Sequence, residues 1–167
     1  MKVIGYIKRK LVFFLVNNVF QGTRPQFFPI KRNLLNGIGY QIGKSSKIVG
    51  PIRCTGTLEV GNNCWIGSGL TIHGNGHVII GDSCDLGPEV TFLTGSHRIG
   101  SPERRAGEGY NSTISIASGC WIGGKSVFTN NIEIGKSVVV AAGALVCKSI
   151  TGNVLVGGVP AKVIRNL

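Results

Sequence analysis

The chain has 167 residues, of which 43% are hydrophobic, so it can bury one core and its length indicates a single domain. Glycine supplies 26 residues, well over twice its usual share of about 7%, so the backbone must turn often, while the lack of a Gly-X-Y triplet excludes collagen. The formal net charge is +11, and residues 1–58 hold ten of the eighteen Lys and Arg residues but no acid before Glu59. A basic end suits an anionic membrane or a solvated face, and without an interleaved aromatic and basic motif we expect no nucleic-acid partner.

Residues 1–40 are predicted to form an amphipathic helical segment, because Ile4, Ile7, Leu11, Phe14 and Leu15 recur at helical spacing. Such a segment either caps the rest of the chain, which is the commoner explanation, or contacts a membrane surface through residues 1–20. The apolar run 11–16 is far too short to span a bilayer, and no Ala-X-Ala cleavage site follows it. We therefore expect a cytoplasmic protein that is at most peripheral to a membrane, and the odd number of cysteines, 5, agrees with a reducing compartment.

From residue 42 onward, an apolar residue recurs every six positions, with a slip of two after Val78. These anchors are Ile42, Ile48, Cys54, Val60, Ile66, Ile72 and Val78, then Ile80, Leu86 and Phe92, and later Ile116, Ile122, Phe128, Ile134, Val140 and Val146. A small or apolar residue often stands two positions before an anchor, as at Leu58, Cys64, Leu70, Cys84, Ser126, Val138 and Ala144. Neither a helical period nor plain alternation fits this spacing, which indicates a short strand followed by a turn.

Three such hexads make one triangular coil, and the cysteine spacing agrees with that geometry. Cys64, Cys84 and Cys120 are therefore expected to stack on one inner wall. We interpret them as small apolar groups that fill this wall rather than as a metal site, because no Cys-X-X-Cys spacing occurs.

Between Phe92 and Ile116 the anchors fail and the chain becomes polar. We expect residues 94–113 to protrude as a loop without regular secondary structure. Long excursions from a solenoid are usually functional and map to the binding face.

Besides the repeat, three motifs appear in order: Thr94-Gly95-Ser96-His97, the segment 119–124 with 140–148, and Gly-Val-Pro-Ala-Lys at 158–162. With the repeat, they resemble the hexapeptide-repeat transferases, which include galactoside, maltose and serine acetyltransferases, over roughly residues 40–167. The resemblance implies an all-β, left-handed parallel β-helix over residues 41–167, a homotrimer and acetyl-CoA as co-substrate. The left hand rests on the resemblance alone, since general chirality rules favour the other hand.

The resemblance implies that His97 is the catalytic base. Such a group is needed because an acceptor hydroxyl loses its proton as it attacks a thioester, and a histidine pKa of about 6.5 suits this at neutral pH. A lone loop histidine more often bonds locally, but the position of His97 at the interruption favours catalysis. A zinc site of His73, His77 and His97, like that of gamma-type carbonic anhydrases, ranks second because their spacing differs and 73–77 resembles a turn that absorbs the slip.

The two later motifs resemble the acetyl-CoA groove of the family. They imply that Trp121 contacts the cofactor, that Gly124 and Ala142 face its pantetheine arm, and that Cys147 and Lys148 meet the nucleotide end. Lys162 and Arg165 are implied to meet the phosphates. A lysine in place of an arginine keeps the charge but loses bidentate geometry. Glycine and alanine at corners are also what any tight coil requires, so these two residue types alone prove little.

The acceptor is less well defined, because Gly67 stands where the galactoside enzymes place an Asn that holds the sugar. Asn75, near another acceptor position of the family, and Asp85 and Glu89, before the loop, are the candidate acceptor residues. Residues 22–35 resemble the lead-in of bacterial enzymes that acetylate surface polysaccharides. We therefore expect O-acetylation of a saccharide, such as a capsule, O-antigen or exopolysaccharide unit, with no metal required. A sugar-nucleotide N-acetyltransferase, a zinc hydratase and a non-catalytic scaffold are the alternatives.

Overall fold

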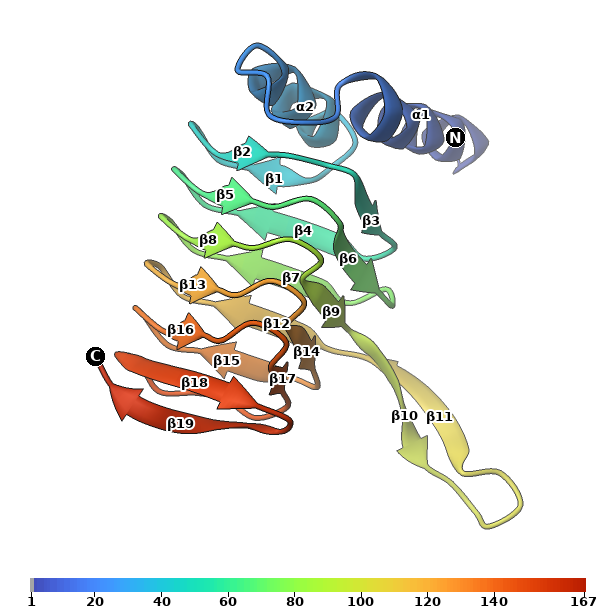
Figure 1. Cartoon of the computed structure of the whole chain (residues 1–167). Coiled ribbons are helices and arrows are strands. Elements are labelled where there is room, and N and C mark those ends of the chain that lie inside the picture. The colour runs from blue at the N-terminus through green and yellow to red at the C-terminus, as the bar shows by residue number, and fades with distance from the viewer. Residues whose placement is uncertain (1) are drawn as a thin grey trace.

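The computed structural model describes residues 2–167, with side chains from residue 5 onward, and consists of two helices on one end of a long β-solenoid (Figure 1). Helix α1 (Lys2–Phe14) runs into a π-helical turn, η1 (Leu15–Val19), and helix α2 (Phe27–Asn36) follows. The solenoid has three parallel walls, which we call sheets A, B and C in the order in which the chain meets them.

Each wall is a ladder of very short strands, one from every coil. Sheet A contains β1 (Gln41–Ile42), β4 (Thr57–Val60), β7 (His77–Ile80), β12 (Thr113–Ile116) and β15 (Ile132–Ile134). Sheet B contains β2 (Lys47–Ile48), β5 (Trp65–Ile66), β8 (Asp85–Leu86), β13 (Trp121–Ile122), β16 (Val139–Val140) and β18 (Val154–Gly158), to which β19 (Ala161–Asn166) adds antiparallel. Sheet C contains β3 (Ile52–Cys54), β6 (Leu70–His73), β9 (Thr91–Leu93), β14 (Val127–Thr129) and β17 (Leu145–Val146). The expected parallel β-helix is confirmed.

The register of the ladders confirms the six-residue anchors. Ile42 pairs with Val60, 18 residues further on, and Val60 pairs with Ile80, 20 residues further on. The two extra residues of the second coil lie in the turn between β6 and β7, as the slip predicted. Val78 points inward as well, but in register with Leu58, two positions before the anchor.

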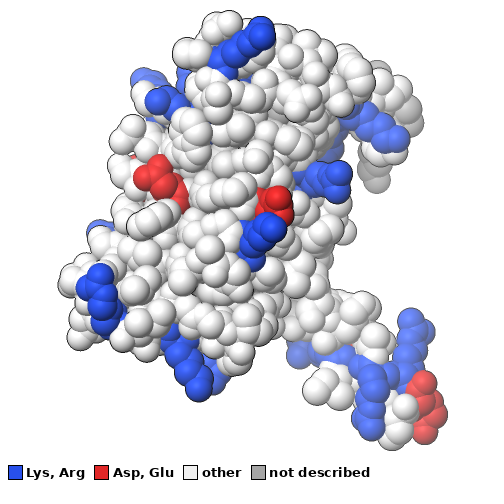
Figure 2. Space-filling view, in the orientation of Figure 1, with Lys and Arg blue, Asp and Glu red and all other residues white. Residues whose placement is uncertain are grey.

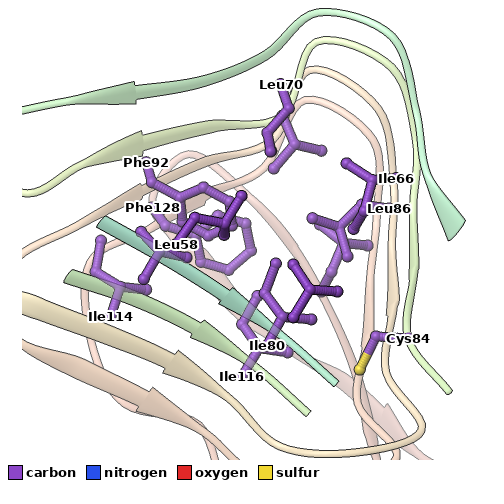
Figure 3. Close-up of a cluster of buried hydrophobic side chains, with 14 of the residues drawn as sticks. Leu58, Ile66, Leu70, Ile80, Cys84, Leu86, Phe92, Ile114, Ile116 and Phe128 are labelled. Atoms are coloured by element: carbon purple, nitrogen blue, oxygen red, sulfur yellow. The ribbon is translucent and has the colours of Figure 1, made fainter. Parts of the chain in front are cut away.

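The anchors fill the centre of the triangle in stacked layers (Figure 3). Phe92 and Phe128 are fully buried and their rings stack at a centroid distance of 5.1 Å. Leu58 and Ile114 approach them from sheet A, and Ile66 lies on sheet B. Because each coil buries its neighbours' inward side chains, the core is continuous along the solenoid.

The predicted stack of Cys64, Cys84 and Cys120 is present and buried beside sheet B. The backbone N–H of Cys84 lies 3.4 Å from the Cys64 sulfur. A hydrogen bond with Cys120 and burial raise the pKa of the Cys84 thiol to about 11. The same hydrogen bond with Cys84 lowers the pKa of the Cys120 thiol to about 7, so the two thiols of this pair are not equivalent. All five cysteines of the chain are free, and the three of the column fill the wall as small side chains.

Helix α1 covers the first coil with a face that its apolar spacing did not indicate. Val12 of α1 and Val16 of η1 are buried, whereas Ile7, Leu11 and Phe14 of α1 are exposed. The side chain of Ile4 lies outside the described residues, and Leu15 is only half-buried. The face expected to seal the solenoid is thus the outward one, because polar contacts of neighbouring residues set the rotation of the helix.

Those polar contacts join α1 and η1 to the edge of sheet C. The Asn17 side chain donates to the Ile52 carbonyl at 2.8 Å and accepts from the Ile52 N–H at 2.9 Å. The Arg9 guanidinium donates to the Tyr40 hydroxyl at 2.7 Å and to the Cys54 carbonyl at 2.8 Å. Backbone groups at the end of the β-ladder are in this way satisfied by side chains.

The expectation of a loop without strands at residues 94–113 is wrong. Strands β10 (Gly95–Ile99) and β11 (Ala106–Asn111) form an antiparallel hairpin that projects from the solenoid (Figure 1). Nearly every residue of both strands is exposed, so neither face carries the apolar alternation that identifies a half-buried strand.

Candidate active site

The hairpin is fixed to the solenoid by two buried polar residues, Thr94 and Ser112. The Thr94 N–H and hydroxyl both donate to the His73 carbonyl, at 2.8 and 3.0 Å, and the hydroxyl oxygen accepts from the Gly76 N–H at 3.2 Å. The N–H of Ser112 donates to the Thr94 carbonyl at 2.7 Å, and its hydroxyl donates to the same oxygen at 3.1 Å. The hairpin therefore has a defined base, although its strands are exposed.

His97 lies on β10, opposite Gly109 in the hairpin register, and is exposed. Its Nδ1 is 2.8 Å from the Gly107 carbonyl oxygen. A carbonyl only accepts, so Nδ1 carries the proton in this bond and Nε2 of the neutral ring keeps its lone pair. This arrangement orients a proton acceptor away from the hairpin backbone.

Asn75 lies at the base of the same hairpin. Its backbone N–H donates to the Asn111 side-chain oxygen at 3.0 Å. Asn111 ends β11, two residues after the partner of His97. The structure thus brings Asn75 near the hairpin, as a residue that contacts its base.

Asp85 lies on the outer face of sheet B, between two tryptophans. Trp65, Asp85 and Trp121 are in register on three successive strands, spaced about 4.8 Å apart as in any sheet. They line an open depression of about 540 Å³ together with Gly67 and Pro88. Aromatic faces beside a carboxylate suit a sugar ring, because the ring stacks on apolar surface while a hydroxyl donates to the carboxylate.

Glu89 lies at the corner between sheets B and C and lines a different depression, of about 370 Å³, with Arg53 and Thr71. Its carboxylate is 3.8 Å from the Lys125 ammonium. Asp85 and Glu89 therefore do not share one cavity.

The cofactor residues predicted from the sequence follow the surface from sheet B across two corners. Gly124 and Ala142 are stacked at the corner between sheets B and C, where the N–H of Gly143 donates to the Gly124 carbonyl at 2.9 Å. Cys147 and Lys148 lie at the next corner, after β17. Lys162 and Arg165 lie on β19, opposite Gly157 and Leu155.

Within one chain, the cofactor residues differ in their position relative to His97: Cys147 and Lys148 follow a strand of sheet C, as the hairpin does, but Gly124 and Ala142 do not. The hairpin leaves from the corner between sheets C and A, whereas Gly124 and Ala142 occupy the corner on the other side of sheet C (Figure 1). About five residues of extended chain, or roughly 15 Å, separate these corners.

The chain matches no protein-family model. It is 29% identical over 150 residues to the galactoside O-acetyltransferase of Escherichia coli K12, which covers 89% of this chain and 74% of that protein. It is also 28% identical over 162 residues to WcaF of the same organism, which is named as a putative colanic acid biosynthesis acetyltransferase. That match covers 95% of this chain and 87% of WcaF. A hexapeptide-repeat acetyltransferase of Vibrio cholerae, solved with acetyl coenzyme A, superposes with a TM-score of 0.83 at 26% identity, covering 98% of this chain and 87% of that one. By its similarity to these enzymes, the chain is an acetyltransferase.

The three histidines of this acetyltransferase do not converge on a metal. The His77 Nε2 lies 3.2 Å from a Glu59 carboxylate oxygen, and its Nδ1 pairs with the Thr57 hydroxyl. His97 bonds to Gly107 on the hairpin instead. Among the residues described, no three His, Cys, Asp or Glu side chains are grouped closely enough to hold an ion. The geometry gives the zinc alternative no support.

Two features of this acetyltransferase were missed in the sequence. Thr94 and Ser112 position the hairpin, and only the family motif includes Thr94, without indicating that it is buried. A depression of about 550 Å³ on sheet A, lined by Ser115, Glu133 and Lys136 among others, had no signal, because outward positions of the repeat carry no regular pattern.

Proposed function

We propose that this acetyltransferase moves an acetyl group from acetyl-CoA to a hydroxyl of a saccharide, with His97 as general base. The observation that carries the proposal is the bond from His97 Nδ1 to the Gly107 carbonyl, which leaves Nε2 as the proton acceptor. Resemblance to galactoside O-acetyltransferase and WcaF supports a saccharide acceptor.

In the proposed reaction, His97 Nε2 takes the proton of the acceptor hydroxyl as its oxygen attacks the thioester carbonyl carbon. The tetrahedral intermediate then collapses, the carbon–sulfur bond breaks, and the sulfur of CoA leaves. The imidazolium returns its proton to that sulfur, so the histidine ends the cycle neutral. The Nδ1 bond to Gly107 keeps the ring oriented throughout.

Acetyl-CoA is proposed to lie along the surface that starts at Trp121 and runs past Gly124 and Ala142, with its nucleotide toward Cys147 and Lys148. The small residues at the corner leave room for a thin pantetheine arm. Lys148, Lys162 and Arg165 form no ion pair with any carboxylate of the described residues, so their charges are available to phosphates. On the acceptor side, we propose Asp85 and Glu89, with Asn75 near the hairpin.

The separation of His97 from Gly124 and Ala142 favours a site between copies. We propose a homotrimer in which the hairpin of one chain reaches the acetyl-CoA surface of its neighbour, since a closed ring suits the flat walls of a triangular prism. The five free cysteines suit a reducing, cytoplasmic setting.

The test is the substitution His97→Ala. Loss of a general base should lower kcat by about a hundredfold to ten-thousandfold, while calorimetry shows unchanged CoA binding. His73→Ala, at another exposed histidine, is the matched control and should leave kcat unchanged. Hydroxylamine lability of the product distinguishes an ester from the amide of an N-acetyltransferase. Full turnover by His97→Ala would refute the proposed base.

A further inference from the structure

Helix α1 has one face buried against the solenoid and one exposed apolar face. Val12 of α1 and Val16 of the following turn η1 face the solenoid and are buried, with exposed fractions of 5% and 0%. Ile7, Leu11 and Phe14, which lie on the opposite side at helical spacing, are 59%, 56% and 58% exposed. An apolar stripe on the outer face of a helix that has already sealed the core needs another partner.

Basic and amphipathic side chains border this stripe. In a helix of 3.6 residues per turn, Lys8 and Lys10 flank the line from Ile7 to Phe14 on either side. The Lys8 ammonium donates to the Gly37 carbonyl at 2.7 Å, so Lys10 is the one of the two whose charge is directed away from the solenoid. The Lys10 ammonium lies 4.7 Å from the centre of the exposed Tyr6 ring. Lysine and tyrosine around an apolar stripe are typical of helices that lie in the interface of a bilayer.

The charge of this end is one-sided. No Asp or Glu precedes Glu59, and the face drawn in Figure 2 shows Lys and Arg but no acidic residue at the helical end. Two copies packed through this stripe would bring like charges together, which disfavours a second copy as its partner. Anionic lipid headgroups complement both the charge and the apolar stripe.

We propose that the outer face of α1 docks this acetyltransferase on an anionic membrane surface, with the helix in the plane of the interface. The described residues contain no helix long and apolar enough to cross a membrane, so the contact is peripheral. Val19 of η1 and Ile30 of α2, 49% and 37% exposed, add apolar surface at the same end of the solenoid (Figure 1). The proposal is independent of the identity of the catalytic base and of the acceptor.

The test is sedimentation of the full chain with vesicles of phosphatidylcholine containing phosphatidylglycerol, against vesicles of phosphatidylcholine alone. We expect the protein to pellet with the anionic vesicles and to be released by salt. Leu11→Asp should weaken partitioning about ten- to a hundredfold, because a leucine is no longer buried in the interface. Lys10→Glu should weaken binding to anionic vesicles about fivefold or more.

Leu167→Asp is the matched control, since it makes the same change at an exposed leucine at the other end of the chain and should bind like the parent. Equal partitioning of the parent chain and Leu11→Asp, or no pelleting with anionic vesicles, would overturn the proposal. Sedimentation velocity without lipid tests whether a second copy of the chain covers the stripe. If Leu11→Asp alone dissociates an oligomer, the stripe is covered by another copy and the membrane assignment is wrong.

Discussion

The hydroxyl of Thr94 ties the base of the His97 hairpin to the solenoid, and the substitution Thr94→Val removes that hydroxyl at nearly constant volume. In the native chain, the hydroxyl donates to the His73 carbonyl at 3.0 Å and accepts from the Gly76 N–H at 3.2 Å. Valine can do neither. The substitution therefore acts on hydrogen bonding rather than on packing.

The two lost bonds differ in cost. The His73 carbonyl still accepts from the Thr94 backbone N–H at 2.8 Å, so losing its bond to the hydroxyl costs little stability. The N–H of Gly76 is buried and has the Thr94 hydroxyl as its acceptor. An unsatisfied buried donor costs about 1–3 kcal/mol, and we expect the free energy of unfolding to fall by that amount.

Denaturant unfolding and steady-state kinetics together measure the effect. Because β10 begins one residue after Thr94, a shifted base also displaces His97, and kcat should fall about tenfold or more with little change in the KM for acetyl-CoA. Thr91→Val is the matched control: its hydroxyl has only a 3.5 Å contact with the Glu89 carbonyl, and it should cost less than about 0.5 kcal/mol. If Thr91→Val lowers the free energy of unfolding or kcat as much as Thr94→Val does, this account of the base of the hairpin is refuted.

Two further predictions concern the hairpin and the cap. A Cβ at Gly107 would lie 3.0 Å from the Arg98 carbonyl, whereas one at Gly109 would lie 3.6 Å from the His97 ring. Gly107→Ala should therefore disturb the bond to His97 and lower kcat more than Gly109→Ala does. Equal kcat values for the two variants would contradict this. Burial lowers the pKa of Lys31 to about 8, below the value of 10.5 in the unfolded chain. Between these two pH values the unfolded chain binds more protons than the folded one, so the contribution of Lys31 to stability rises as the pH rises. The parent chain should therefore gain stability relative to Lys31→Met between pH 8 and 10 in thermal or denaturant unfolding, and a difference that does not change with pH would exclude this titration.

The sequence predicted the solenoid well because its signal is periodic and physical. An inward residue must recur wherever a wall faces the core, so Ile42, Val60 and Ile80 mark both the walls and the coil length. Even the slip was visible, since an extra pair of residues in one turn delays every later anchor. Cys64, Cys84 and Cys120 were placed correctly for the same reason.

The features that were missed lack such a period. The strands of the hairpin are exposed on both faces, so their residues carry no alternation that would distinguish a strand from a loop. The rotation of α1 depends on single contacts, such as Asn17 with Ile52 and Arg9 with Tyr40, which no hydrophobic pattern encodes. The relation of His97 to Gly124 depends on how copies assemble, which lies beyond the order of residues in one chain.

The place of the hairpin explains how a strict repeat accommodates a catalytic insertion. Phe92 pairs with Phe128, 36 residues further on, so the insertion adds the length of one coil and the wall resumes in register. The ladder continues beneath it, since Thr113 pairs with His77 directly after the hairpin returns. An insertion at a corner leaves every inward layer intact, whereas one within a wall would break the parallel hydrogen bonds on both sides. Changes in the hairpin beyond its base should therefore alter rate and acceptor choice while leaving the stability of the solenoid almost untouched.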